Sequence, residues 1–210
     1  NIVLLRNPYN MGLNQTLNNC LAVAQGEYIA RMDGDDICDP TRFEKQVKFL
    51  DEHLEYAIVS NPMFYFDENG IFGRGRAKEG EASKNVFNYG SPFCHAPCMV
   101  RKEAYDKVGG YTVDKKLLRV EDYELWVKMY AAGYKGYNLG EYLYSMRDDR
   151  NAVARRNWKN RKNEIYAHWL AYKRLNLSFF KFVKVATITF AKAFTPTFIY
   201  NYFHKKNLNR

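Results

Sequence analysis

The feature that most constrains the fold is an apolar segment that leads straight into an acidic turn and then into a helix. Residues 27–32 have the pattern of a strand, and Asp33-Gly34-Asp35-Asp36 follows without a break. Asp39 and Pro40 then predict a helix start, with Asp39 as N-cap and Pro40 at the first helical position. This order predicts an α/β sheet with an acidic turn beyond the carboxyl end of a strand, where open α/β sheets bind ligands.

Expected strands and helices alternate over the rest of residues 1–150. Further strands are expected at 2–5, 56–60, 63–66, 71–72, 98–101, 135–138 and 142–146. Helices are expected at 12–24, ended by Gly26, and at 120–132, ended by Gly133. The helix after Pro40 should bury one face made of Phe43, Val47, Leu50 and Leu54. This alternation predicts a mostly parallel α/β sheet.

The acidic turn has the composition of a site for a hard cation. Two carboxylates separated by one residue, such as Asp33 and Asp35, can both reach one Mg²⁺ or Mn²⁺, which keeps open positions for substrate phosphates. Such an ion can neutralise the charge on a departing nucleotide diphosphate. The alternative is a solvated turn or an ordinary helix N-cap, because Asp and Gly favour both.

A second acidic pair, Glu121-Asp122, opens the expected helix at 120–132. A carboxylate there could take the proton of an acceptor hydroxyl on the face opposite a leaving diphosphate, which typically contributes about 10²–10⁴-fold to the rate. The alternative is favourable charge at a helix N-terminus, worth about 0.3–1 kcal/mol.

Taken together, the ordered motifs resemble those of glycosyltransferase family 2, whose members have the GT-A fold and build bacterial polysaccharides. The motifs are Asn10-Met11-Gly12-Leu13 with Leu17-Asn18, residues 26–36 with Pro40, Arg42 and Gln46, residues 95–101, Gly109-Gly110-Tyr111, and Glu121-Asp122. The resemblance implies a GT-A catalytic domain over residues 1–150, with a mixed α/β sheet flanked by helices. It also implies that an earlier β-α-β unit, which holds the nucleotide base, is missing from this chain.

The resemblance implies roles for particular residues. Asp122, beside Glu121, would be the catalytic base, and Asp35 would ligate the metal. The donor would contact Asp33, Asp35, Asp36, Asn18 and Arg147, and the acceptor side would include His95 and Trp126. His95 is equally compatible with a hydrogen-bonded loop histidine, and Arg147 with a salt bridge to Asp148 or Asp149. Many members have R-x-H where this chain has Arg147-Asp148-Asp149, so Asp149 would stand in for the histidine. Leu17 replaces an arginine of some members.

Residues 151–210 form a basic, aromatic and helical tail. They hold 13 Lys and Arg against one acidic residue, Glu164. On a helix over 177–194, Lys181, Lys184 and Lys192 share one side and phenylalanines fill much of the rest, a pattern typical of a membrane interface. The alternatives are packing against the catalytic domain and nucleic-acid binding, for which no recognised motif is present.

The sequence therefore predicts an inverting, metal-dependent glycosyltransferase that uses Mg²⁺ or Mn²⁺. The expected donor is a nucleotide-diphosphate sugar, by default a UDP-sugar, and the expected acceptor is a saccharide or a lipid-linked saccharide of bacterial surface polysaccharide synthesis. The expected location is cytoplasmic, peripheral at the inner face of the plasma membrane, in contact with anionic lipid and not with nucleic acid. The alternatives are a nucleotidyltransferase and a truncated saccharide- or membrane-binding remnant.

Overall fold

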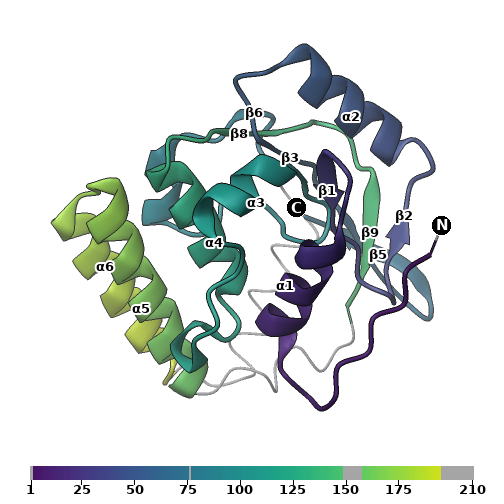
Figure 1. Cartoon of the computed structure of the whole chain (residues 1–210). Helices are drawn as coiled ribbons and strands as arrows, with labels where there is room; N and C mark the ends of the chain where they lie inside the picture. Colours follow the sequence, from purple (N-terminus) through teal and green to yellow (C-terminus); the bar gives the residue numbers. More distant parts are fainter. Residues whose placement is uncertain (1, 76, 149–157, 195–210) are drawn as a thin grey trace.

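Two mixed sheets form the centre of the molecule in the computed structural model, which describes residues 2–75, 77–148 and 158–194 (Figure 1). The five-stranded sheet has the order β1 (Tyr28–Ala30), β7 (Met99–Arg101), β3 (Ile58–Ser60), β8 (Gly136–Asn138) and β6 (Gly80–Glu81). The four-stranded sheet has the order β2 (Ile37–Cys38), β9 (Tyr144–Arg147), β4 (Phe64–Asp67) and β5 (Gly70–Arg74).

Only β3–β8 and β4–β9 are parallel pairs among these strands, so the prediction of a mostly parallel sheet is wrong. The chain leaves β3 through the β4–β5 hairpin rather than through a crossover helix, and it returns as β7 antiparallel to both β3 and β1. The expected strands at 63–66 and 71–72 form this hairpin, with Asp67 opposite Gly70 at its turn.

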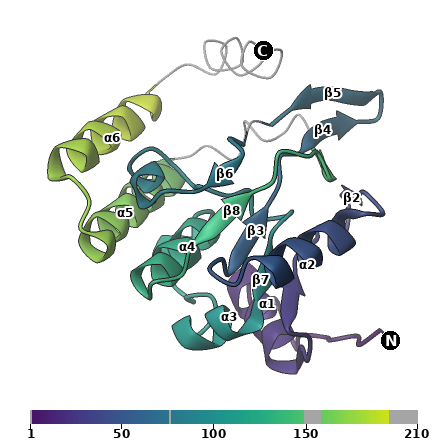
Figure 2. The ribbon, with the colours of Figure 1, turned by 90° about the horizontal axis from the view of Figure 1, so that it is seen from above.

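Helices cover both faces of the five-stranded sheet. They are α1 (Leu13–Val23), α2 (Arg42–Glu52), α3 (Lys102–Val108), α4 (Glu121–Ala131), α5 (Trp158–Leu175) and α6 (Phe179–Lys192), with short 3₁₀ helices η1 (Lys84–Asn88) and η2 (Lys115–Leu117). Figure 2 shows α2 on one side of the sheet and α4 on the other, with α5 and α6 outside α4. Because side chains of a strand alternate in direction, Val59 and Met99 pack toward Leu50 of α2, whereas Ile58 and Val100 join the core around α4.

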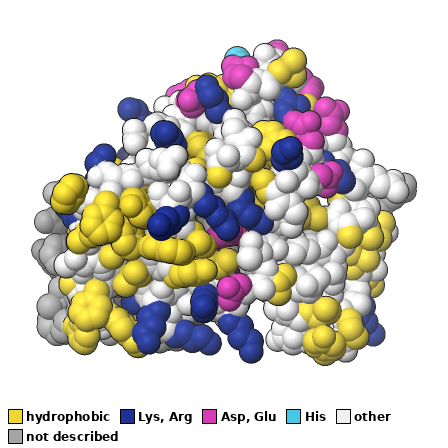
Figure 3. All heavy atoms as spheres, turned by 60° about the vertical axis from the view of Figure 1, so that its left-hand side comes forward, with side chains coloured by type: hydrophobic (Ala, Val, Ile, Leu, Met, Phe, Trp, Pro, Cys, Tyr) yellow, Lys and Arg dark blue, Asp and Glu magenta, His cyan; other side chains and the backbone are white. Residues whose placement is uncertain are grey.

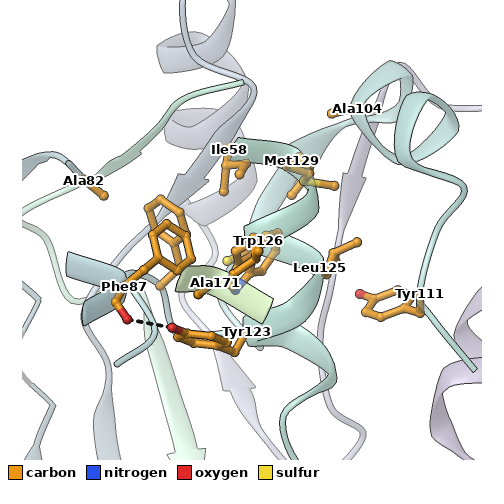
Figure 4. Packing of buried hydrophobic residues seen from close by; sticks show 14 of the residues in the cluster. Ile58, Ala82, Phe87, Ala104, Tyr111, Tyr123, Leu125, Trp126, Met129 and Ala171 are labelled. Carbon is orange, nitrogen blue, oxygen red and sulfur yellow. Dashed lines mark hydrogen bonds between the residues drawn. The ribbon is translucent and has the colours of Figure 1, made fainter. Parts of the chain in front are cut away.

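The main core lies between α4 and its neighbours (Figure 4). Trp126, Leu125 and Met129 of α4 are fully buried, and the Tyr123 hydroxyl donates to the Phe87 carbonyl at 2.6 Å. Ala171 of α5 packs into the same core. The first helix of the basic tail is thus part of this core.

An ion pair strengthens the contact between α4 and α5. Arg174 of α5 lies 2.5 Å from Glu124 of α4, whose side chain is 1% exposed. Helix α6 packs against α5, where Tyr172 stacks with Phe182 and Trp158 meets Phe190 edge to face. Arg155 and Arg156 of the tail, and Asp149 before it, lie outside the described residues.

The expected strand at 2–5 is wrong. Residues 2–5 have no strand partner among the described residues, and Ile2 and Leu4 are 98% and 90% exposed. β1 forms an edge of the five-stranded sheet, and a cavity of about 360 Å³ lies beside it, lined by Leu17 and Leu21 of α1. An exposed strand edge and exposed apolar side chains therefore lie on this side of the molecule.

Helix boundaries also differ in detail from the sequence expectations. α2 begins at Arg42 with Thr41 as N-cap. Just before it, the Asp39 carboxylate accepts hydrogen bonds from the Thr41 N–H at 2.9 Å and the Thr41 hydroxyl at 2.6 Å. α1 ends at Val23 rather than at Gly26. The buried face of α2 consists of Arg42, Gln46 and Leu50, whereas Phe43 and Leu54 are exposed.

Candidate active site

Asp36 anchors the acidic turn to strand β9. Its side chain is buried, and one carboxylate oxygen accepts from the Tyr144 hydroxyl at 2.7 Å while the other accepts from the Arg147 N–H at 2.8 Å. Burial raises the pKa of Asp36 above its usual value. Both oxygens are engaged inside the protein, so Asp36 holds the turn in place, and its contact with the donor stays a prediction.

Asp33 and Asp35 of the same turn face outward. Asp33 is half-exposed and pairs with the Arg31 guanidinium at 2.6 Å. Asp35 is exposed, and its carboxylate has no hydrogen-bond partner among the described residues. Arg147 lies over this turn, because its Nε donates to the Asp35 carbonyl at 3.3 Å and its guanidinium sits 4.7 Å from the Phe66 ring centre.

These two carboxylates fit a divalent cation that takes its remaining ligands from a substrate. No group of three or more His, Cys, Asp or Glu side chains within residues 2–75, 77–148 and 158–194 could hold a metal ion by itself. Mg²⁺ is commonly held by one or two carboxylates together with water and substrate phosphates, and Asp33 and Asp35 provide that number. A donor diphosphate would complete such a site.

Arg31 connects the acidic turn to the second acidic pair. Burial raises the pKa of Asp122 to about 6, Glu121 beside it adds to the rise, and the positive charge of Arg31 opposes it. The same arginine therefore pairs with Asp33 and lowers the pKa of Asp122 through its charge. We did not predict a role for Arg31. Its position two residues before Asp33 is the signal, since residues i and i+2 of an extended chain share a face.

Glu121 and Asp122 face different spaces. Asp122 lines a cavity of about 660 Å³ bounded by α4, α5 and α6. Glu121 lines another, of about 470 Å³, together with Leu13 and Lys159. Asp122, whose pKa is raised, stays the predicted base, and Glu121 lies beside it at another cavity.

His95 and Trp126, predicted on the acceptor side, are held in the interior. Trp126 is 0% exposed, so it cannot offer a surface to a sugar and instead meets the His95 ring edge to face at 5.8 Å. His95 Nε2 lies 2.7 Å from the Tyr111 hydroxyl, and burial lowers the pKa of His95 to about 3. A neutral, hydrogen-bonded loop histidine is the result, which agrees with the alternative interpretation from the sequence.

Asn18 makes two hydrogen bonds with the backbone of Tyr111. Its amide N–H donates to the Tyr111 carbonyl at 2.8 Å, and its carbonyl oxygen accepts from the Tyr111 N–H at 2.8 Å. Gly110, at φ +64°, lies so close that an added Cβ would be 2.5 Å from the Asn18 oxygen. Asn18 therefore connects α1 to the Gly109-Gly110-Tyr111 turn, and its contact with the donor stays a prediction.

Arg42 and Gln46 are buried residues of α2 that hold the backbone next to the acidic turn in place. The buried Arg42 guanidinium donates to the carbonyls of Arg31 at 2.8 Å and Cys98 at 3.3 Å, and Gln46 donates to the Pro97 carbonyl at 2.7 Å. The guanidinium also lies 5.0 Å from the Tyr144 ring centre. Arg42 therefore joins the end of β1, the loop that carries His95, and the tyrosine that holds Asp36.

The fold matches solved glycosyltransferase structures. A Staphylococcus aureus TarS fragment (residues 1–349) in complex with UDP-GlcNAc superposes with a TM-score of 0.60 at 14% identity, over 85% of this chain and 52% of that one. The mannosyltransferase PcManGT from Pyrobaculum calidifontis, in complex with GDP-Man and Mn²⁺, gives a TM-score of 0.54 at 16% identity, over 94% and 65%. These likenesses define the class by fold and confirm the GT-A architecture. The chain spans about half of the TarS fragment.

Sequence comparison gives the family. The model of the family described as Glycosyl transferase family 2 matches residues 1–109. The putative glycosyltransferase EpsE of Bacillus subtilis is 38% identical over 99% of this chain and 74% of its own length. The Escherichia coli UDP-Gal:alpha-D-GlcNAc-diphosphoundecaprenol beta-1,3-galactosyltransferase is 30% identical over 96% and 73%. The chain belongs to glycosyltransferase family 2, as its motifs predicted.

Proposed function

We propose that this protein is an inverting, metal-dependent glycosyltransferase that moves a sugar from a nucleotide-diphosphate donor, by default a UDP-sugar, to a lipid-linked saccharide. The names of the relatives support the donor and acceptor classes, because they include UDP-Gal and GlcNAc-diphosphoundecaprenol for the Escherichia coli enzyme and UDP-GlcNAc for TarS. Bacterial surface polysaccharide synthesis is the setting that these relatives suggest, and the Erwinia amylovora relative AmsE is named for amylovoran biosynthesis.

One observation carries the proposal: Arg31 pairs with Asp33 of the acidic turn and also acts on Asp122. An inverting transfer needs a leaving diphosphate on one face of the sugar and a proton acceptor for the incoming hydroxyl on the other. Asp33 and Asp35 suit the first position and Asp122 the second. With a pKa of about 6, Asp122 is mostly ionised at neutral pH and is still basic enough to accept a proton.

A Mg²⁺ or Mn²⁺ ion would be held by Asp35 and Asp33, and when bound it would neutralise charge on the leaving diphosphate. The residues of this chain do the remaining work. Arg31 keeps Asp33 oriented, Asp36 and Tyr144 keep the turn at β9, and Arg147 adds a positive charge beside the turn.

The acceptor side would rest on the inner face of the plasma membrane. Phe180 and Phe194 of the α6 region are 84% and 70% exposed, and Lys181 and Lys184 lie on the same helix. Basic and aromatic helices of this kind lie in membrane interfaces. Within the described residues, no helix has the length and hydropathy needed to cross a bilayer.

Isothermal titration of the protein with UDP in the presence and absence of Mn²⁺ tests the donor site. We expect metal-dependent binding that Asp35→Ala abolishes, because that variant removes an outward-facing carboxylate without disturbing a hydrogen bond. Glu44→Ala, which removes an exposed carboxylate from α2, is the matched control and should bind like the wild type. Absence of metal-dependent UDP binding, or undiminished binding by Asp35→Ala, would contradict the proposal.

A further inference from the structure

The cavity behind Asp122 is far larger than the space of one water molecule. It encloses about 660 Å³ between the start of α4, the loop at Tyr89–Ser91, and helices α5 and α6. Asp122, the base in the proposed function, is one of the residues that line this cavity. A group bound here would therefore lie beside the base.

The cavity is lined by three basic side chains, Arg119, Arg161 and Lys192, and by two acidic ones, Asp122 and Glu164. Arg161 is already engaged, because its guanidinium donates to both carboxylate oxygens of Glu164 at 2.7 Å. Arg119 and Lys192 also line the cavity, and neither has an ion-pair partner in the part of the chain that the structure describes. Burial lowers the pKa of His168 on the same wall, and the Lys192 charge acts in the same direction.

An apolar wall lies directly beside these cations. Val185 and Ile188 of α6 line the cavity, and Ile188 is also exposed toward solvent, so the wall continues onto the outer surface of the helix. Figure 3 shows this face of the molecule, where hydrophobic side chains form a broad area and Lys and Arg side chains lie along it. The cavity therefore offers two cations at its opening and an apolar path that leads away from them.

We propose that this cavity binds the diphosphate of a lipid-linked acceptor, with Arg119 and Lys192 pairing with the phosphates and the prenyl chain lying along Val185 and Ile188. The inference rests on the proposed function and adds the acceptor's binding site to it. Phosphate oxygens are strong partners for Arg and Lys, and a diphosphate provides enough negative charge for two of them. A sugar carried on that diphosphate would point toward Asp122, where its hydroxyl loses a proton to the base.

The charges and the apolar wall together favour a lipid diphosphate over a free one. Inorganic phosphate or pyrophosphate would satisfy Arg119 and Lys192 but would leave Val185 and Ile188 in water. A lipid alcohol would cover the apolar wall but leave both cations unpaired. Only a ligand with both parts uses the whole cavity.

Farnesyl diphosphate is a soluble probe for the test. Its binding to the full protein is measured by isothermal titration in the presence of saturating UDP and Mn²⁺, so that the donor site is filled. We expect binding that weakens at least tenfold in the double variant Arg119→Ala/Lys192→Ala. Lys173→Ala, which removes an exposed charge from α5 outside the cavity, should bind like the wild type. Because Arg119 and Lys192 are exposed, the double variant should melt within a few degrees of the wild type.

Three results would overturn the inference. They are equal affinity of the double variant and the wild type, farnesol or pyrophosphate binding as tightly as farnesyl diphosphate, and displacement of farnesyl diphosphate by UDP, which would place the probe in the donor site. The proposed function fails separately, since the preceding titration with UDP and Mn²⁺ reports on the acidic turn alone. If the protein bound farnesyl diphosphate through Arg119 and Lys192 but did not bind UDP, the proposed donor site would be contradicted and the proposed lipid diphosphate site would be supported.

Discussion

The acidic turn and the cavity behind Asp122 are built in opposite ways. The turn uses residues that are close in sequence, Arg31 to Asp36, and hydrogen bonds from Tyr144 and Arg147 of β9 hold it. The cavity gathers side chains from Tyr89 to Lys192, which reach one place only because α4, α5 and α6 pack together. A site made from a local motif is rigid through polar contacts, whereas a site made by helix packing depends on the core beneath it.

The largest expected effect concerns Asp122, the proposed base, which lines the cavity. Asp122→Asn should reduce sugar transfer by about 10²–10⁴-fold, because it removes the proton acceptor, while metal-dependent UDP binding stays unchanged. Glu121→Gln, in the neighbouring residue that faces another cavity, should cost much less. Initial rates with radiolabelled UDP-sugar measure both. If Glu121→Gln abolished transfer and Asp122→Asn did not, the two residues would have to exchange roles.

Arg42→Met tests how far the turn depends on its buried support. The substitution leaves the carbonyls of Arg31, Ala96 and Cys98 without their shared donor, so we expect the free energy of unfolding to fall by roughly 2–4 kcal/mol. Urea denaturation followed by circular dichroism measures the loss. Lys48→Met, on the exposed side of the same helix, should stay within about 0.5 kcal/mol of the wild type. A similar result for both variants would show that the network does not stabilise the fold.

The raised pKa of Asp122 predicts a particular pH dependence. A carboxyl whose pKa rises on folding, here from 3.8 to about 6, favours the protonated form, so its contribution to stability is full below pH 4 and is lost as the pH passes through about 6. Asp122→Asn should therefore gain on the order of 2 kcal/mol relative to wild type between pH 4 and pH 7. Denaturation at the two pH values measures this gain.

The same group sets the pH dependence of transfer in the opposite sense. Because the base works only when ionised, transfer by the wild-type protein should fall as the pH drops below about 6. A flat rate between pH 5 and pH 7 would exclude Asp122 as the base.

The smallest expected difference separates two adjacent aspartates. Asp36→Asn breaks the acceptor pair for Tyr144 and Arg147 and should lower stability by roughly 1–2 kcal/mol, whereas Asp35→Asn should leave stability unchanged and weaken metal-dependent UDP binding. Thermal melting and calorimetry on the same two variants give both quantities. Equal melting temperatures would show that Asp36 is not an anchor.

The sequence was sufficient where the determining contacts are local. The strand–turn–helix order around Asp33, the β4–β5 hairpin and the start of α4 at Glu121 follow from patterns within a few residues. It was insufficient where identical residue types differ only by their partners. Asp35 and Asp36 are neighbours in sequence, but Tyr144, more than a hundred residues away, makes one of them structural. Asn18 is of a residue type that often contacts ligands, but its hydrogen bonds with the Tyr111 backbone give it a structural role.

Patterns of hydrophobicity also missed polar residues that are buried. The face of α2 looked apolar through Phe43 and Leu54, yet Arg42 and Gln46 are fully buried because carbonyl groups of the loop before β7 need donors. The alternation of strands and helices predicted parallel pairing, and the hairpin after β3 reversed the direction of β7. Hydrogen bonds between distant parts of the chain determine both the buried face of α2 and the pairing of β7, and they leave no periodic pattern in the sequence.

The ion pair between Glu124 and Arg174 bears on the distance between the membrane surface and the proposed base. It joins α5 to α4, which carries Asp122 in its first turn, and α6 packs on α5. The surface that would rest on lipid and the base therefore belong to one packed unit. The distance from the bilayer to the base is then a fixed length. The protein would then select lipid-linked acceptors by the distance between the membrane surface and the sugar that receives the transfer.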